Sequence, residues 1–330
     1  MKNILNKLFN YQSLEKEEAR EILTNLASGA YNHSQMAAFM TVFMMRNITV
    51  DELSGFRDAM LELCIKIPAE GYNAIDLCGT GGDGKDTFNI STLASFVVAG
   101  AGYHVAKHGN YGVSSVCGSS NVLEYLGCKF SSDVGRIMKS FDQSNIAFLH
   151  APLFHPAMKN VAPIRKELGV KTFFNMLGPM VNPAAPMNQM VGVFNLELAR
   201  LYGYLYQNTD KNFLIVHSLD GYDEISLTGD FKYIFNEGEA IGTPSLLGLS
   251  YLDAVDLSGG SDIKSSAQLF KEILDCKGTD SQNNVVIANA GMAIATINGS
   301  PFEAAVEEAR TSLISGKAKS TFSKFLEINA

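Results

Sequence analysis

A glycine-rich segment at residues 79–86, with the sequence GTGGDGKD, has the residue types of an anion-binding loop. Glycines leave backbone N–H groups accessible to an anion. The polar residues Thr87, Asn89 and Ser91 follow where a helix is expected to begin. Because the first turn of a helix presents unpaired N–H groups and the positive end of its dipole, this junction predicts a phosphate site.

The spacing alone leaves several interpretations of this loop open. Three glycines fit the dinucleotide pattern G-x-G-x-x-G: Gly79, Gly81 and Gly84. That pattern also requires an acid after the second strand, and here the strand expected at 103–106 is followed by Lys107. The P-loop pattern G-x-x-x-x-G-K fits as well, but Asp86 stands where a magnesium-binding Ser or Thr belongs. A sugar-phosphate or pyrophosphate cradle remains the favoured interpretation, and a structural turn is the alternative.

Further charged residues could take part in chemistry. The adjacent acids Asp223 and Glu224 could bind Mg²⁺ together with phosphate oxygens, or form a solvated turn. Lys107 could bind a phosphate or remain a solvated cation. Arg165 could hold a carboxylate through two parallel hydrogen bonds or lie on a helix surface. His108 could act as a base, although histidines in loops more often only form hydrogen bonds.

The elements that would position these residues fall into two regions. Up to about residue 70 the periodicity predicts helices only, with Ser13 and Ser34 as N-caps and a capping box from Thr49 to Glu52. From residue 74 short apolar runs alternate with helical segments. Strands are predicted at 74–78, 103–106, 146–149, 191–194, 213–217 and 285–288, and helices at 92–101, 119–126, 133–141 and 196–207. This alternation predicts an α/β sheet.

A helix from about 301 to 316 is predicted near the C-terminus, because Ser300 and Glu303 form a capping-box pattern with Pro301 at the first helical position.

Length and composition exclude several protein classes. The 330 residues carry a net charge of −8, which disfavours nucleic-acid binding. No apolar run is long enough for a membrane span, and the N-terminal segment lacks the apolar stretch of a secretory signal. Five scattered cysteines without a C-x-x-C pair indicate reduced thiols rather than a zinc site. We therefore expect a cytoplasmic protein with no membrane and no nucleic-acid partner.

Six motifs in order carry a family resemblance. They are DLCGTGGD at 76–83, NIST at 89–92, KHGN at 107–110, RKELG at 165–169, FNMLGP at 174–179 and DEIS at 223–226. Together they closely resemble the anthranilate phosphoribosyltransferase family, and the resemblance covers nearly the whole chain. It implies transfer of the phosphoribosyl group of 5-phosphoribosyl 1-pyrophosphate to anthranilate, with release of pyrophosphate, in tryptophan biosynthesis.

The resemblance also implies the architecture of the pyrimidine nucleoside phosphorylase-like fold. A small N-terminal helical domain at 1–70, with a second contribution from about 154–182, would accompany a large α/β domain at 71–330 with a mostly parallel central sheet. A homodimer with two Mg²⁺ ions per subunit is implied as well.

The site residues carried over from the family are these. Donor binding is implied for Gly79, Gly82, Asp83, Thr87, Asn89, Ile90, Ser91, Thr92, Lys107, His108, Gly109, Asn110, Tyr111, Gly112, Val113, Ser114, Ser115 and Ser119. Mg²⁺ would be held by Ser91, Asp223 and Glu224. Arg165 would bind the carboxylate of anthranilate, with Asn110 and His108 helping to position the substrates, and no residue is singled out as a chemical catalyst.

The sequence departs from the family pattern at Tyr111, where most members carry Arg after the KHGN motif. A charge often available to the donor phosphate is therefore absent. Two other functions compete. A nucleoside phosphorylase would not need Arg165 or the acidic pair Asp223 and Glu224. A nucleic-acid-binding relative without activity should carry a basic face, which the net charge disfavours.

Overall fold

The computed structural model describes residues 1–112 and 116–330, which form two compact units. The first unit combines Met1–Lys66 with Pro152–Pro183, and the second combines Ile67–Ala151 with Ala184–Ala330. Val113, Ser114 and Ser115, which were predicted to bind the donor, lie outside the described residues.

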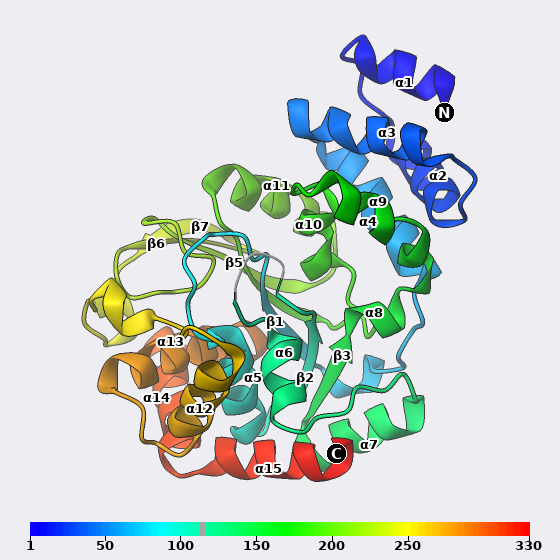
Figure 1. Cartoon of the computed structure of the whole chain (residues 1–330). Helices are drawn as coiled ribbons and strands as arrows, with labels where there is room; N and C mark the ends of the chain where they lie inside the picture. Colours follow the sequence, from blue (N-terminus) through cyan, green and yellow to red (C-terminus); the bar gives the residue numbers. More distant parts are fainter. Residues whose placement is uncertain (113–115) are drawn as a thin grey trace. The chain divides into compact units, whose positions relative to one another are not determined.

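The first unit is helical, as the periodicity predicted (Figure 1). Its helices are α1 (Lys2–Phe9), α2 (Lys16–Ala27), α3 (His33–Met45), α4 (Val50–Leu63), α9 (Ala162–Leu168) and α10 (Phe174–Leu177), with short 3₁₀ turns η2 (Pro156–Asn160) and η3 (Gly178–Met180). The short helix α8 (Ala151–Phe154) carries the chain into the second stretch of this unit.

Helices α2, α3 and α4 begin after residues whose side-chain oxygens accept hydrogen bonds from the first helical turn. The predicted capping box of Thr49 and Glu52 is confirmed at the start of α4. The two other predicted caps are wrong. Glu15, not Ser13, caps α2, and α3 begins after Asn32, whose Oδ1 accepts from the N–H of Gln35 at 2.9 Å. Asn is at least as good an N-cap as Ser, so the helix begins before Ser34.

Aromatic packing explains why the 152–183 stretch folds with the N-terminal helices. Phe39 and Phe43 of α3 and Phe56 of α4 surround Phe173, which stacks on Phe56 with ring centroids 4.5 Å apart. All four rings are buried. Such aromatic pairs contribute roughly 0.5–1.5 kcal/mol each beyond the burial of their area.

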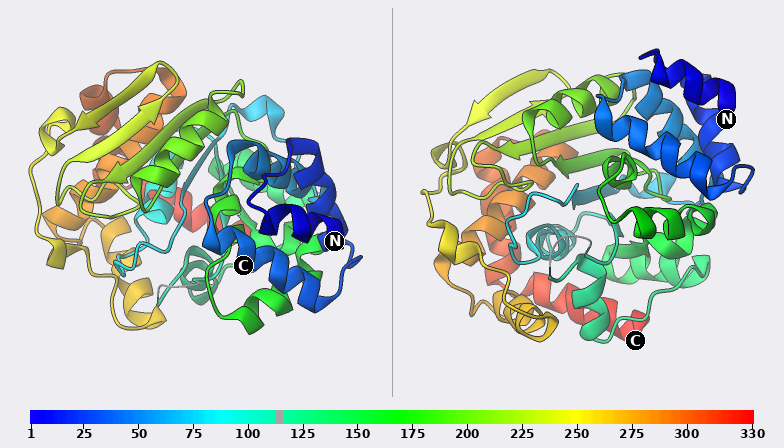
Figure 2. Two further views of the ribbon diagram at one scale, coloured as in Figure 1. Left: turned by 90° about the horizontal axis from the view of Figure 1, so that it is seen from above. Right: turned by 45° about the horizontal axis from the view of Figure 1, so that its top comes forward.

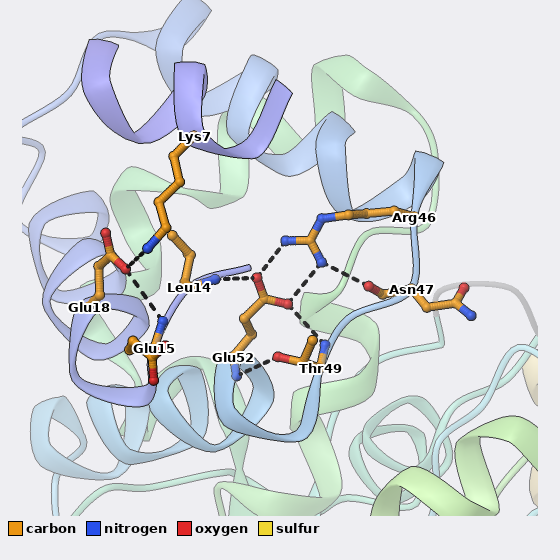
Figure 3. Close-up of polar contacts among 8 residues, drawn as sticks. All are labelled: Lys7, Leu14, Glu15, Glu18, Arg46, Asn47, Thr49 and Glu52. Atoms are coloured by element: carbon orange, nitrogen blue, oxygen red, sulfur yellow. Dashed lines mark hydrogen bonds and ion pairs between the residues drawn. The ribbon is translucent and has the colours of Figure 1, made fainter. Parts of the chain in front are cut away.

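A buried carboxylate on α4 bonds to the α1–α2 connection and to the end of α3 (Figure 3). The side chain of Glu52 is fully buried and accepts from Arg46 Nη2 at 2.5 Å, from the Leu14 N–H at 3.0 Å and from the Thr49 N–H at 2.9 Å. Because a buried charge is tolerated only when it is paired and hydrogen-bonded, this set of contacts fixes the α1–α2 connection against α4.

The second unit contains the sheet. Its strands are β1 (Ile75–Gly79), β2 (Val105–Gly109), β3 (Ile146–His150), β4 (Asn188–Gly192), β5 (Asn212–Ser218), β6 (Phe231–Phe235) and β7 (Gly238–Gly242). Its helices are α5 (Ile90–Gly100), α6 (Ser119–Tyr125), α7 (Val134–Ser144), α11 (Leu196–Tyr206), α12 (Ile263–Leu274), α13 (Asp280–Asn298), α14 (Phe302–Ile314) and α15 (Lys317–Asn329).

The strand order is β3-β2-β1-β4-β5-β6-β7, and only β6 and β7 run antiparallel to their neighbours. The order reverses direction between β1 and β4. Right-handed crossovers therefore place α5 and α11 on opposite faces of the sheet, and α13 packs beside α5 (Figures 1 and 2). The mostly parallel sheet confirms the predicted fold class.

Two predicted elements of this unit are wrong. Residues 285–288 belong to the buried helix α13 and not to a strand. The capping box at 300–303 does not form, because α14 begins at Phe302 without a side-chain cap and the Ser300 hydroxyl has no hydrogen-bond partner within the described residues.

No single helix in the described part of the chain has both the length and the apolar character needed to cross a membrane, and only the sharply bent pair α13 and α14 meets those criteria jointly.

Candidate active site

The candidate site lies at the carboxyl ends of β1 and β4, where the strand order reverses. Gly79 ends β1 and Gly192 ends β4, and these two residues are paired in the sheet register. In open parallel sheets, ligands bind outside the strand ends at such a reversal. The glycine loop therefore stands where the fold itself provides a ligand position.

An acidic loop between β5 and β6 packs directly over these two glycines. A Cβ at Gly79 would overlap Asp223 Oδ2, and one at Gly192 would overlap the Asp223 carbonyl oxygen. The Gly81 N–H donates to Asp223 Oδ2 at 2.6 Å, and Gly81 has a left-handed φ of +68°. Glycine is thus required for close approach at 79 and 192 and for backbone conformation at 81.

A buried asparagine of α13 holds the backbone of the acidic loop. Asn289 Oδ1 accepts from the Ile225 N–H at 3.1 Å, and its Nδ2 donates to the Ile225 carbonyl at 2.9 Å. Ser218 Oγ donates to the Glu224 carbonyl at 2.7 Å. These bonds fix the direction in which the two acidic side chains leave the backbone. The sequence analysis missed Asn289, although one polar residue in the apolar run 285–295 indicates a buried group that needs partners.

Glu224 is joined to Lys107 through the first turn of α5. The hydroxyl and the backbone N–H of Ser91 lie near the Glu224 carboxylate and act to lower its pKa. Lys107 Nζ donates to the Leu77 carbonyl at 2.5 Å and to Ser91 Oγ at 3.3 Å. Lys107 is only 2% exposed, and burial lowers its pKa. It is therefore not the solvated cation considered as an alternative.

The acidic pair is crowded with negative charge. Burial, followed by the neighbouring charges of Glu224 and Asp83, raises the pKa of Asp223 well above its usual range. Burial raises the pKa of Glu224 to about 7, against the opposing effect of Lys107. Two such carboxylates with a nearby hydroxyl suit Mg²⁺, which needs few protein ligands when phosphate oxygens complete its shell. They are not a solvated turn.

A complete protein cage for a metal is absent within residues 1–112 and 116–330, where no group of three or more His, Cys, Asp or Glu side chains could hold an ion.

The end of β2 and the segment after it carry the next group of predicted site residues. The His108 N–H donates to the buried carboxylate of Asp76 at 3.2 Å. Asn110 and Asn121 tie the following segment to α6. The Asn110 carbonyl accepts from the Ser120 N–H at 3.1 Å, and Asn121 Oδ1 accepts from the N–H groups of Gly112 and Gly118 at 2.9 and 3.0 Å.

Most predicted site residues lie around this edge of the second unit. The loop after β1 and its surroundings contain Gly79, Gly82, Asp83 and Thr87, and the start of α5 contains Asn89, Ile90, Ser91 and Thr92. The end of β2 and the residues after it contain Lys107, His108, Gly109, Asn110, Tyr111 and Gly112. Helix α6 begins with Ser119, and the loop before β6 contains Asp223 and Glu224. Within this set Ile90, Thr92, Lys107, His108 and Asp223 are buried, whereas Asn110, Tyr111 and Gly112 are exposed.

Arg165 belongs to the first unit, on α9. Its guanidinium carbon lies 5.2 Å from the centre of the Phe174 ring, and Nη2 donates to Asn175 Oδ1 at 3.4 Å. Burial alone lowers its pKa, and no carboxylate pairs with it in the described part of the chain. A half-buried arginine without an acidic partner suits an external carboxylate better than a solvated helix surface.

Comparison with known proteins matches the chain along most of its length. Residues 71–319 match the glycosyl transferase family, a/b domain, and residues 2–64 match the helical bundle domain of the same family. The anthranilate phosphoribosyltransferase of Flavobacterium psychrophilum is 64% identical over 329 residues, covering 100% of both chains. That of Christiangramia forsetii is 63% identical over 330 residues, covering 100% of this chain and 99% of the relative.

Solved structures agree in fold. The anthranilate phosphoribosyltransferase of Thermus thermophilus has a TM-score of 0.92 and 32% identity, covering 98% of each chain. The enzyme of Saccharomyces cerevisiae, solved in complex with PRPP and Mg, has a TM-score of 0.89 and 24% identity, covering 98% of this chain and 96% of that one.

Proposed function

The chain belongs to the anthranilate phosphoribosyltransferase family, and from this premise we propose that it transfers the phosphoribosyl group of 5-phosphoribosyl 1-pyrophosphate to the amine of anthranilate. The products are N-(5-phosphoribosyl)anthranilate and pyrophosphate, and the step belongs to tryptophan biosynthesis. The observation that supports this most is the pair of the buried Asp223 and the half-buried Glu224, placed against the start of α5. A pyrophosphate donor requires that combination of cation site and N–H groups.

The donor would lie along the glycine loop and the start of α5. Backbone N–H groups of the loop and of Asn89–Thr92, with the hydroxyl of Thr87, would bind its phosphates. The Thr80 hydroxyl is buried without a hydrogen-bond partner within the described residues, so it is available to a bound group. The segment from Gly109 to Gly112 and Ser119 would close the other side.

Mg²⁺ would be held by Asp223 and Glu224, and a second ion by Ser91, giving two per subunit. When bound, the ions neutralise charge that builds up on the departing pyrophosphate. The protein's part is to hold the carboxylates ready, through Asn289 and the Gly81 N–H. Lys107 adds fixed positive charge beside Ser91.

The acceptor would be held by Arg165, whose fork of N–H donors matches the carboxylate of anthranilate. Asn110 and His108 would help to orient the substrates. The reaction then needs no protein nucleophile, because the aromatic amine attacks C1 of the ribose as pyrophosphate leaves. Orientation and charge neutralisation supply the acceleration.

We further propose a cytoplasmic homodimer whose two-part helical domain corresponds to the first unit and whose catalytic domain corresponds to the second. Exposed apolar side chains on the first unit support a contact with another copy: Phe9 is 58% exposed, Tyr11 86% and Met45 83%. Sedimentation of the purified chain measures its oligomeric state directly.

The reaction is tested by following anthranilate fluorescence in purified protein with phosphoribosyl pyrophosphate, with and without Mg²⁺. We expect fluorescence to fall only when the donor and Mg²⁺ are both present, with pyrophosphate released in equal amount. A folded protein that leaves anthranilate unchanged at saturating substrates would refute the proposal. Phosphorolysis of a nucleoside by the same preparation would instead indicate the phosphorylase function.

Mg²⁺ should stabilise the protein more at about pH 8 than at about pH 6. The pKa of Glu224 is about 7 in the fold against 4.5 in an ordinary glutamate. Between these values the folded chain holds a proton that the unfolded chain releases, so stability without metal falls as the pH rises through this window. Mg²⁺ binds the deprotonated pair and reverses that loss. Melting temperatures measured across the window with and without Mg²⁺ check this, and an equal Mg²⁺ shift at both pH values would contradict it.

A further inference from the structure

A chain of aromatic rings runs beneath the segment that follows β2. Phe148 and His150 lie two residues apart on β3 and therefore share one face of the sheet. Phe130 stacks on both, with ring centroids 5.2 Å from Phe148 and 4.5 Å from His150. The Tyr111 ring packs edge-on against His150, with centroids 4.8 Å apart at 77°.

Each end of this chain touches the segment that carries Asn110. A Cβ at Gly109 would overlap the Phe148 ring, so the backbone there rests directly on that ring. At the other end the Tyr111 hydroxyl donates to Glu124 Oε1 on α6 at 3.2 Å. The segment is therefore fixed at Gly109 by the Phe148 ring and at Tyr111 by the bond to Glu124.

His150 is the residue that connects the two ends. It is buried between Phe130 and Tyr111, and its Nδ1 forms a hydrogen bond with Ser120 Oγ at 2.8 Å. Ser120 in turn donates its backbone N–H to the Asn110 carbonyl at 3.1 Å. One imidazole thus contacts the ring of Tyr111 and, through Ser120, the backbone of the residue before it.

Tyr111 brings no positive charge to the site, and its hydroxyl is directed to a carboxylate. It therefore cannot assist an anionic donor by charge neutralisation. We propose that Tyr111 and His150 are positioning residues that clamp the backbone of residues 109–112 in its donor-binding conformation. This inference rests on the proposed function, because it assigns the clamp to the phosphoribosyl pyrophosphate site.

The clamp lowers the ordering cost of donor binding. A segment already fixed by ring contacts loses little conformational freedom when a ligand binds, which strengthens affinity without any new contact to the ligand. Loss of the clamp should therefore weaken donor binding while the bound complex reacts at an ordinary rate.

The test compares Tyr111→Ala, Tyr111→Phe and His150→Ala with Tyr125→Phe, a matched change to an exposed tyrosine at the end of α6. Donor affinity is measured by calorimetry with phosphoribosyl pyrophosphate and Mg²⁺, and kcat and KM are measured for both substrates. Amide hydrogen exchange of Gly112 and Gly118, whose N–H groups bond to Asn121, reports the order of the segment without any substrate.

We expect Tyr111→Ala and His150→Ala to weaken donor binding about tenfold, with kcat and the KM for anthranilate little changed and with faster exchange at Gly112. Tyr111→Phe keeps the ring contact and should lie between Tyr111→Ala and the wild type, and Tyr125→Phe should match the wild type. Unchanged exchange and donor affinity in Tyr111→Ala would overturn the clamp. Faster exchange with unchanged donor affinity would make the rings purely structural and would overturn the positioning role. Failure of the wild-type protein to bind the donor would overturn the proposed function and, with it, the role of the clamp. The exchange data would then still show whether the rings order the segment.

Discussion

Replacing Glu224 with Gln is expected to lower kcat/KM by about 10²–10³-fold, because the variant lacks a carboxylate ligand for the Mg²⁺ that would neutralise the departing pyrophosphate. The amide has nearly the same shape as the carboxylate, and Asn289 and Ser218 still hold the backbone, so the loop should keep its structure. The KM for anthranilate should change little, since Arg165 is untouched. Steady-state rates at several Mg²⁺ concentrations measure the effect.

The same variant has an opposite expected effect on stability. Without metal, Glu224→Gln removes a carboxylate that burial and crowding disfavour, so the melting temperature at about pH 8 should rise above that of the wild type. The added stabilisation by Mg²⁺ should shrink. The matched control is Glu237→Gln, an exposed glutamate at the β6–β7 turn, which should leave rate and melting temperature unchanged. A Glu224→Gln enzyme with wild-type activity and wild-type Mg²⁺ response would remove Glu224 from the metal site.

The second large effect is expected from Arg165→Ala, which should raise the KM for anthranilate about 30–100-fold. A charge-assisted pair of hydrogen bonds contributes roughly 2–3 kcal/mol, and the truncation loses both bonds. Affinity for the donor, measured by calorimetry, should remain that of the wild type. The melting temperature should change little, because losing the contacts with Phe174 and Asn175 is offset by removing a half-buried charge that has no acidic partner in the described residues.

Arg165→Lys should recover only part of the affinity, because an ammonium group cannot form the two parallel bonds. Lys166→Ala removes an exposed cation from the next position of α9 and is the control for charge alone. An unaltered KM for anthranilate in Arg165→Ala, or an equal rise in Lys166→Ala, would contradict the assignment.

Local patterns predicted much of the fold. Five of the six strands inferred from short apolar runs lie in the sheet, because buried parallel strands are apolar on both faces and are bounded by turn residues. The prediction of a sixth strand at 285–288 was wrong for a related reason. Helix α13 is surrounded by other elements and is apolar on all sides, so its sequence shows no helical period. Strands β6 and β7 were not predicted.

The site was predictable in its residue types but not in its electrostatics. Local sequence signals mark the glycines, Ser91 and the acidic pair, because they lie in loops or at a helix start next to predicted strands and helices. The burial of Lys107 beneath Ser91 depends on the pairing of β2 with its neighbours, and the support from Asn289 comes from a helix 64 residues farther along the chain. Local sequence does not reveal such distant contacts, nor the burial that is the main cause of the raised pKa of Glu224.

The central pairing of β1 with β4 also determines when the site can exist. The contact between Ala74 and Asn188 closes 114 residues of chain, and that between Gly81 and Asp223 closes 142. Closing such long loops is entropically unfavourable, so we expect it to come late in folding, after local contacts such as those between α7 and β3. The anion and metal ligands therefore assemble only as the chain reaches its native state. Bound substrate would slow the unfolding of the finished protein, but it has no completed site to bind while the chain is still folding.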